Sequence, residues 1–283
     1  MVVFKKPAHL QTFLQNRRRS GETIGFVPTM GALHPGHLSL LAASRNACSL
    51  TVASIFVNPA QFNNPDDFNR YPVNTEKDIE LLIAAGCEVL FLPAAETIYP
   101  ADYIPVLYDL GYLEKILEGT YRPGHFQGVC RVMDRLLQII QPDDLFMGQK
   151  DLQQCMVVKK LLADKKIGCR FHQCPTLREA DGLAMSSRNI RLTQEQRVQA
   201  RGISAILNRL KDQLVPGHLD RLTTAGRVSL EEQGFRVDYL DIARTSDLEL
   251  IREWDGKEPV TALAAAFLGD VRLIDNLTLN KPA

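Results

Sequence analysis

Short apolar segments alternate with helix-like segments over the first two thirds of the chain, and this alternation limits the possible folds more than any other feature. Apolar runs of strand length lie at 23–28, 51–59, 88–93, 143–148 and 169–175. Segments with helical features lie between them, at 36–49, 75–86, 125–142 and 151–165. Strands that are apolar throughout are buried on both faces. The pattern therefore predicts an α/β fold with a parallel sheet and helices on both sides of it.

The last third of the chain has a different pattern. A long helix is expected at 193–214, where Thr193 and Gln196 form an opening close to a capping box. Two strand-like runs follow at 235–243 and 260–269. The chain has 283 residues, and domains usually contain about 100–150 residues. We therefore expect two domains, an α/β domain at 1–180 and a smaller α+β domain at 181–283.

The charges of the chain balance, with 33 Lys and Arg residues against 33 Asp and Glu residues. This balance argues against a partner chosen by bulk electrostatics, such as duplex DNA or an anionic membrane. The run Arg17–Arg19 is a local exception, and it is interpreted as a solvated helix end rather than a nucleic-acid patch. No apolar run approaches the length of about 20 residues that spans a bilayer.

The cysteine pattern predicts reduced thiols. The chain has six cysteines, and none of them forms a C-x-x-C pair or joins a histidine cluster at zinc spacing. Most have apolar neighbours, which is typical of buried thiols in a reducing compartment. Because the N-terminus also lacks the apolar stretch of a signal peptide, we expect a cytoplasmic protein without a metal site of its own.

The most informative motif is PTMGALHPGH, at 28–37. A strand ends at Pro28, a glycine-containing turn follows, and a helix begins near Gly36. The N-terminus of a helix presents unpaired N–H groups and the positive end of its dipole, so it can bind phosphate. His34 and His37 lie three residues apart on one side of this helix start. Their imidazoles could donate hydrogen bonds to a triphosphate, so the motif predicts a nucleotide site.

The segment AMSSRN, at 184–189, has the residue types of a phosphate clamp. Ser186 and Ser187 can donate through their hydroxyls, and Arg188 can hold two oxygens at once. The signal is weak by itself, because such sequences occur in many loops. Together with the two histidines it resembles the HIGH and KMSKS signatures of the nucleotidylyl-transferase superfamily.

The segment FMGQKDLQQ, at 146–154, follows the strand expected at 143–148. Lys150 supplies a positive charge for phosphate, and Asp151 could accept a hydrogen bond from a ribose hydroxyl. Gln154 lies one helical turn beyond Lys150 and can face the same cleft. The alternative is an ordinary helix start with solvated polar side chains, and this segment alone does not decide between the two.

Two further segments place polar side chains near expected strand or helix ends. In SIFVNPAQF, at 54–62, Asn58 and Gln61 offer neutral amides that suit a small substrate with hydroxyl and carboxylate groups. Turn chemistry around Asn58 is the alternative. In YRPGHFQGV, at 121–129, Arg122 is interpreted as a candidate anion ligand and His125 as a structural residue.

These segments, in this order and spacing, resemble the signature blocks of the pantothenate synthetase family, and VDYLDI (237–242) and RLIDNL (272–277) resemble its C-terminal blocks. The resemblance therefore spans nearly the whole chain. It implies a Rossmann-like, doubly wound N-terminal domain, a smaller C-terminal domain that acts as a lid, and a homodimer. It also implies an AMP-forming ligase. Pantoate and Mg·ATP first give pantoyl-adenylate and pyrophosphate, and β-alanine then displaces AMP.

The resemblance also implies residue roles. Gln61 would hold pantoate and contact β-alanine, and Gln154 would hold pantoate. Asn58 and Arg122 are added to the substrate site on their residue types and positions alone. His37 would be the proton donor, with His34 and Lys150 as further catalytic residues. The residues implied in ATP binding are Met30, Gly31, Ala32, Leu33, His34, Pro35, Gly36, His37, Gly148, Gln149, Lys150, Asp151, Leu177, Met185, Ser186, Ser187 and Arg188.

One position departs from the family pattern, since Gln149 stands where Glu is usual. A neutral amide therefore lies beside Lys150, which leaves open any role of a carboxylate in ordering that lysine or assisting a metal ion. Two rival functions are considered. One is a nucleotidyltransferase with a phosphate acceptor, which would favour cations where the chain has Gln61 and Gln154. The other is a nucleotide-binding protein without catalysis.

Overall fold

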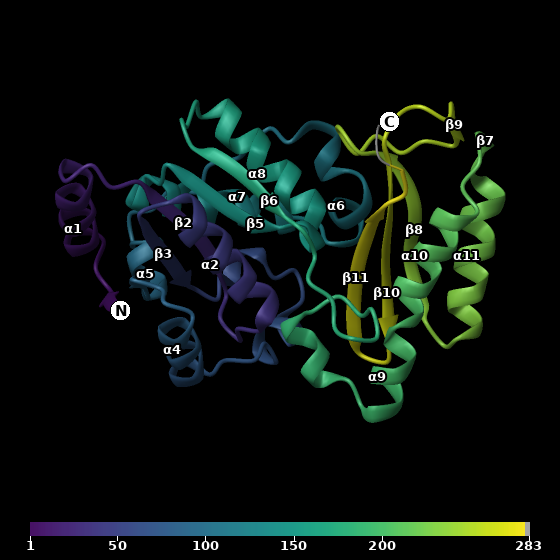
Figure 1. Ribbon diagram of the computed structural model, residues 1–283, viewed down its shortest axis with the longest axis horizontal. Coiled ribbons are helices and arrows are strands. Elements are labelled where there is room, and N and C mark those ends of the chain that lie inside the picture. The colour runs from purple at the N-terminus through teal and green to yellow at the C-terminus, as the bar shows by residue number, and fades with distance from the viewer. Residues whose placement is uncertain (281–283) are drawn as a thin grey trace. The chain divides into compact units, whose positions relative to one another are not determined.

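A computed structural model describes residues 1–280 and resolves two compact units. The N-terminal unit comprises Met1–Gln149 and Gln154–Pro175. The C-terminal unit comprises Lys150–Gln153 and the chain from Thr176 onward. Figure 1 shows the helices and strands of both units along the chain. No helix within residues 1–280 is long and apolar enough to cross a membrane.

The N-terminal unit is built on a six-stranded sheet in which all paired strands are parallel, in the order β1-β4-β3-β2-β5-β6. Its strands are β1 (Val2–Phe4), β2 (Ile24–Thr29), β3 (Leu50–Ile55), β4 (Val89–Phe91), β5 (Asp144–Gly148) and β6 (Arg170–Cys174). The inner strands are almost fully buried, as expected for a sheet with both faces covered.

Helices cover both faces of this sheet. The longer ones are α1 (Pro7–Arg19), α2 (Pro35–Ala47), α4 (Thr75–Ala84), α7 (His125–Ile140) and α8 (Leu152–Asp164). On one face, Leu40 and Leu41 of α2 and Leu82 of α4 pack with Val27 and Ala53 of the sheet. Since crossovers between parallel strands are right-handed, the strand order places α1, α7 and α8 on the other face, where α1 contacts α7. The predicted Rossmann-like, doubly wound architecture is thereby confirmed.

Shorter elements complete the N-terminal unit. They are α3 (Pro65–Asn69), α5 (Ala95–Ile98), α6 (Leu117–Tyr121) and the 3₁₀ helices η1 (Pro59–Gln61), η2 (Gly111–Glu114) and η3 (Gln149–Asp151).

The strand order reverses direction at β2. Strand β3 pairs with one side of β2, and β5 pairs with the other. Ligands of open α/β sheets bind outside the carboxyl ends of the strands at such a point. The residues that follow Thr29 and Gly148 are therefore in the position where this fold binds ligands.

The arginines at the end of α1 have specific partners. The Arg18 guanidinium donates to the carbonyl oxygens of Ile140 and Gln141, both at 2.6 Å. Arg17 forms an ion pair with Glu22 at 2.7 Å. The predicted helix end is confirmed, but Arg18 also caps the C-terminus of α7, where a cation is favoured by the helix dipole.

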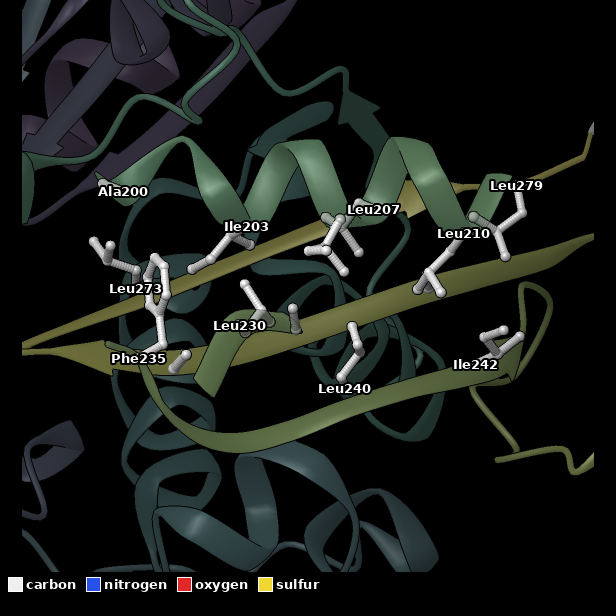
Figure 2. Packing of buried hydrophobic residues seen from close by; sticks show 14 of the residues in the cluster. Ala200, Ile203, Leu207, Leu210, Leu230, Phe235, Leu240, Ile242, Leu273 and Leu279 are labelled. Atoms are coloured by element: carbon white, nitrogen blue, oxygen red, sulfur yellow. The ribbon is translucent and has the colours of Figure 1, made fainter. Parts of the chain in front are cut away.

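The C-terminal unit contains an antiparallel sheet of three strands in the order β11-β10-β8. Helices α10 and α11 lie against it, and Figure 2 shows Ile203, Leu207 and Leu210 of α10 meeting Leu240 and Leu273 of the sheet. The elements are η4 (Ser187–Arg191), α9 (Gln194–Ala200), α10 (Gly202–Asp212), β7 (Gly217–His218), α11 (Asp220–Glu232), β8 (Arg236–Arg244), β9 (Glu253–Trp254), β10 (Val260–Leu268) and β11 (Val271–Thr278).

The prediction of a single helix at 193–214 is wrong, because the segment forms two helices that meet at Arg201. Gly202 is poorly suited to a helix interior. A Cβ atom at Gly202 would lie 2.5 Å from Oε1 of Gln233, so its missing side chain allows this close approach. The capping box of Thr193 and Gln196 is present as expected.

All six cysteines, Cys48, Cys87, Cys130, Cys155, Cys169 and Cys174, are free thiols. Three of them, Cys87, Cys130 and Cys155, are buried, which confirms the expectation for those positions. Burial raises the pKa of Cys87 to about 11 and that of Cys130 to about 12, so both thiols are protonated near neutral pH.

Candidate functional site

The loop between β2 and α2 has an unusual backbone. Gly31 has a φ of +81° and Ala32 a φ of +49°, so two consecutive residues adopt the left-handed region. The first of these conformations favours glycine, and the second is uncommon for a residue with a side chain. A Cβ atom at Gly31 would also lie 2.9 Å from a carboxylate oxygen of Asp78. The surrounding structure must therefore hold this loop in place.

Asp78 is the group that holds it. This residue lies on α4 and is only 3% exposed. Its Oδ2 accepts from the N–H of Ala32 at 2.8 Å, and its Oδ1 accepts from the N–H of Leu33 at 2.7 Å. Sequence reasoning did not identify Asp78. The available signal was a carboxylate one helical turn before Leu82, on the buried side of its helix.

His34 and His37 form a reciprocal cap at the start of α2. Nδ1 of His34 accepts from the N–H of Gly36 at 3.1 Å, and Nδ1 of His37 accepts from the N–H of His34 at 3.3 Å. Their ring centroids lie 4.0 Å apart. A neutral imidazole that accepts through Nδ1 carries its proton on Nε2. In this capping box Nε2 is therefore the nitrogen of each neutral ring that can donate.

Asn58 and Gln61 follow β3 and reach the loop that follows β2. Nε2 of Gln61 contacts the sulfur of Met30 at 2.7 Å, and Nδ2 of Asn58 donates to Oε1 of Gln61 at 3.2 Å. Both amides are buried. Two segments that the sequence proposed separately are therefore brought together at the carboxyl edge of the sheet.

Arg122 and His125 support the segment that carries Gln61. His125 is buried, and its Nδ1 donates to the carbonyl oxygen of Gln61 at 2.8 Å. Its Nε2 then accepts from Arg122 at 3.3 Å. Arg122 also lies 3.4 Å from a carboxylate oxygen of Glu118. This arrangement agrees with the structural interpretation of His125, and it gives Arg122 protein partners in addition to any ligand.

The end of β5 carries the next group of predicted residues. Gly148 ends the strand, and Gln149, Lys150 and Asp151 form η3. Nζ of Lys150 lies 3.3 Å from Asp151, and its side chain is 16% exposed. Gln154 is half-buried in the first turn of α8.

Asn276 fixes the backbone of Lys150 within the C-terminal unit. Its Nδ2 donates to the carbonyl oxygen of Lys150 at 2.9 Å. Asn276 lies on β11, inside the block that the sequence resemblance noted at 272–277, but no role was assigned to it from the sequence.

The predicted clamp is the end of a tight hairpin in the C-terminal unit. Arg178 and Ala184 form an antiparallel bridge, and the N–H of Met185 donates to the carbonyl oxygen of Leu177 at 3.0 Å. Ser186 then caps η4 by accepting from the N–H of Arg188 at 3.3 Å. Leu177 is exposed, whereas Ser187 is buried.

Arginine ion pairs hold this hairpin. Arg178 forms two bonds to the buried Asp275 carboxylate, at 2.6 Å and 3.0 Å. Arg197 bridges Glu179 and Asp181, at 2.5 Å and 2.6 Å. The Arg197 guanidinium lowers the pKa of Asp181 below its ordinary value. The hairpin is thus attached to β11 on one side and to α9 on the other.

The predicted site residues fall into two groups. Met30–His37, Asn58, Gln61, Arg122, Gly148, Gln149 and Gln154 belong to the N-terminal unit, and Lys150, Asp151, Leu177 and Met185–Arg188 belong to the C-terminal unit. Within residues 1–280, no three His, Cys, Asp or Glu side chains are arranged to hold a metal ion.

Comparisons with known proteins give one consistent result. The model of the pantoate-beta-alanine ligase family matches residues 2–278. A pantothenate synthetase from Cytophaga hutchinsonii is 40% identical over 99% of both chains, and pantothenate synthetase 1 from Bradyrhizobium diazoefficiens is 42% identical over 99% of both chains.

Solved structures agree with these relatives. The crystal structure of pantothenate synthetase from Thermus thermophilus has a TM-score of 0.91 at 37% identity, and the match covers 99% of this chain and 100% of that one. A pantoate-beta-alanine ligase from Francisella tularensis, complexed with beta-gamma ATP and beta-alanine, has a TM-score of 0.83 at 34% identity over the full length of both chains.

Proposed function

We propose that this chain, which belongs to the pantoate–β-alanine ligase family, uses ATP to join pantoate to β-alanine through a pantoyl-adenylate intermediate. The observation that carries the proposal is the reciprocal cap at the start of α2, in which Nδ1 of His34 and Nδ1 of His37 each accept a backbone N–H, so that a neutral ring carries its proton on Nε2. The two histidines lie next to the point where the strand order of the sheet reverses. A helix N-terminus with two fixed imidazoles is suited to a polyphosphate.

The first step transfers the adenylyl group. A carboxylate oxygen of pantoate attacks the α-phosphorus of ATP, the bond from that phosphorus to the bridging oxygen breaks, and pyrophosphate leaves. Negative charge builds on the departing oxygen. In our proposal, Nε2–H of His37 donates to that oxygen, and His34 and Lys150 bind the phosphate oxygens. Fixed donors of this kind stabilise the transition state more than the bound substrate.

The second step forms the amide. The amine nitrogen of β-alanine attacks the carbonyl carbon of the mixed anhydride, the bond from that carbon to the AMP oxygen breaks, and the nitrogen loses a proton. The anhydride hydrolyses readily, so exclusion of water is essential. We propose that the C-terminal unit acts as the lid that provides it, with Ser186, Ser187 and Arg188 on the phosphates.

The substrate contacts of the proposal lie mainly in the N-terminal unit. Gln61 and Gln154 hold pantoate, Gln61 also meets β-alanine, and Arg122 is the remaining candidate from the sequence. The neutral amides favour a substrate with hydroxyl and carboxylate oxygens over one with a phosphate. Met30–His37, Gly148–Asp151, Leu177 and Met185–Arg188 are proposed to bind ATP.

The proposal treats Mg²⁺ as part of the substrate. Magnesium keeps several of its waters and is commonly bound through substrate phosphates and one or two carboxylates. We therefore propose that it enters with ATP, and that Asp151, the carboxylate among the predicted site residues, would be available to it. A homodimer, a cytoplasmic location and a domain boundary near residue 180 remain predictions of the sequence.

The test of the proposed function is pyrophosphate release from ATP by the purified protein. We expect release that depends on pantoate, and pantothenate as the product when β-alanine is added. A nucleotidyltransferase would instead require a phosphorylated acceptor. A binding protein would release no pyrophosphate with any acceptor. Either result would contradict the proposal.

A further inference from the structure

Every hydrogen-bonding position of the Asn58 side chain is occupied by the protein. Its Oδ1 accepts from Tyr99 Oη at 2.9 Å and from the N–H of Ala60 at 3.2 Å. Its Nδ2 donates to the carbonyl oxygen of Gly128 at 3.1 Å and to Oε1 of Gln61 at 3.2 Å. A side-chain amide has two acceptor positions and two donors. Because Asn58 is also 1% exposed, it has no group left with which to bind a substrate.

The partners of Asn58 allow only one orientation of its amide. The N–H of Ala60 can only donate, and the carbonyl oxygen of Gly128 can only accept. A rotation of the Asn58 amide by 180° would place its NH₂ group against the N–H of Ala60 and its oxygen against the oxygen of Gly128. Both contacts would be repulsive, so the backbone fixes the orientation of the amide.

Tyr99 reinforces this orientation from a third direction. Burial raises the pKa of Tyr99 well above its ordinary value, so its phenol keeps its proton and can donate to Asn58.

Gly128 allows the close packing that the network needs. A Cβ atom at Gly128 would lie 2.0 Å from the carbonyl oxygen of Ala60, so α7 can approach η1 only because this residue is glycine.

The orientation of Asn58 determines that of Gln61. Because Nδ2 of Asn58 is a donor, the atom of Gln61 that faces it must be Oε1. The NH₂ group of Gln61 is then directed the other way, toward Met30 in the loop after β2. One N–H can meet the sulfur of Met30, which leaves the second for another acceptor.

We propose that Asn58, held by Tyr99, is a positioning residue that makes Gln61 meet its ligand as a hydrogen-bond donor. The ligand atom at Gln61 is then an acceptor, such as a carboxylate or hydroxyl oxygen. This inference rests on the proposed function in one respect, since it takes the ligand of Gln61 to be pantoate. It changes the expected role of Asn58, from substrate contact to orientation of its neighbour.

The test is a double-mutant cycle between Asn58→Asp and Gln61→Glu, read as the KM for pantoate and the KM for ATP. Gln61→Glu removes the donor. Asn58→Asp removes the Nδ2 donor, so the Gln61 amide turns and presents oxygen to the ligand. Each change should raise the pantoate KM by on the order of 10- to 100-fold, the range expected when a buried polar group loses its partner, with little change for ATP.

The two changes should not add. If Asn58 acts through Gln61, the double variant should have about the same pantoate KM as Gln61→Glu alone, because residues in one network show strong coupling. Additive effects would show that Asn58 acts independently, and they would overturn the proposal. So would a folded Asn58→Asp protein with a normal pantoate KM.

Two further variants keep the test decisive. Asn64→Asp makes the same chemical change six residues away, at an exposed N-cap where Asn and Asp are equivalent, and should leave both KM values unchanged. If Asn58→Asp does not fold, Tyr99→Phe takes its place in the cycle. That change should raise the pantoate KM about 2- to 10-fold, since the backbone partners remain.

The outcome separates the two proposals. A wild-type protein without pantoate-dependent pyrophosphate release contradicts the proposed function. An active wild-type protein whose Tyr99→Phe and Gln61→Glu changes are additive contradicts only the positioning role.

Discussion

The two loops that carry most of the predicted ATP-binding residues are held by different kinds of contact. In the N-terminal unit, the loop after β2 is fixed through its own backbone, by the buried Asp78 carboxylate and by the reciprocal cap of His34 and His37. In the C-terminal unit, the hairpin before η4 is fixed through side chains, by ion pairs of Arg178 and Arg197.

This difference indicates which loop is preorganised and which can adjust. Backbone N–H groups bonded to a buried carboxylate keep one geometry, and fixed donors need no reorganisation during a reaction. Arg178 bonds one side of the hairpin to the buried Asp275 carboxylate. The Arg197 ion pairs on its other side are about one-third exposed, and such pairs contribute little and respond to salt. The loop after β2 therefore suits catalysis, and the hairpin suits a part that closes on its ligand.

The largest effect is expected for His37→Ala. It removes the Nε2–H donor proposed to stabilise the leaving pyrophosphate, and loss of one such donor typically lowers the rate by about 10²–10³. It also removes half of the cap of α2, which should reduce the free energy of unfolding by about 1 kcal/mol. Single-turnover formation of pantoyl-adenylate and a thermal melt measure the two effects.

The exposed His9 on α1 provides the control, and His9→Ala should change neither quantity. A folded His37→Ala protein with near-normal adenylation would remove the role proposed for this histidine.

A smaller loss of rate is expected for Asp78→Asn. The new NH₂ group would face the N–H of Ala32 or Leu33, so the loop would shift. A displacement of about 1 Å at a catalytic group can lower the rate about 10²-fold. Adenylation should therefore slow although Asp78 contacts no proposed ligand. Glu80→Gln, on the exposed side of the same helix, is the matched control. Equal rates for both variants would show that the loop does not depend on the carboxylate.

High pH should destabilise the N-terminal unit, because all six cysteines lie in it and ionisation of a buried thiol favours the unfolded chain. The pKa of Cys87 is raised to about 11 in the folded protein. A thiol with a higher pKa in the folded than in the unfolded protein stabilises the fold fully at pH values below the unfolded pKa of about 8.5. This stabilisation is lost as the pH rises toward 11. Between about pH 7 and pH 10 the free energy of unfolding should fall by on the order of 1 kcal/mol from this thiol.

Urea unfolding of the wild type and of Cys87→Ala at both pH values measures this contribution. The alanine variant starts from a lower stability, because the substitution leaves a cavity, but it should lose less on going to high pH. The same loss in both proteins would contradict the assignment to Cys87.

The smallest effect is expected from salt. Raising NaCl from about 0.05 M to about 0.5 M screens exposed charges. Amide hydrogen exchange across 183–189 should speed up by about 2- to 5-fold, in line with the modest free energy of exposed ion pairs. Exchange across 31–34 should stay the same. Arg197→Gln should abolish the salt dependence, and equal acceleration of both loops would contradict the comparison.

The sequence was sufficient to predict the architecture of the N-terminal unit, because it depends on short-range patterns, whereas the roles of the site segments stay predictions. Apolar strands, helix caps and the spacing of His34 and His37 are all visible within a few residues. The break at Arg201 was missed although Gly202, which is poorly suited to a helix interior, is visible in the sequence. The close approach of Gln233 to Gly202 was not visible there. Strand β1 was missed because it has three residues, and the side chains of Val2 and Val3 are exposed.

The residues that position the site were also missed. Asp78 lies more than 40 residues from the loop that it holds, and Tyr99 lies 41 residues from Asn58. Hydrogen bonds of this kind leave no periodicity in a single sequence. The donor role of Gln61 follows only from its neighbours in space, whereas its residue type alone permits either role.

Exchange of labelled pyrophosphate into ATP tests the central claim most directly. If pantoyl-adenylate forms as a separate intermediate, its formation is reversible, and label should enter ATP in the presence of pantoate with no β-alanine added. The account predicts exchange under those conditions and none when pantoate is left out. Exchange that requires β-alanine as well would contradict the separate adenylation step.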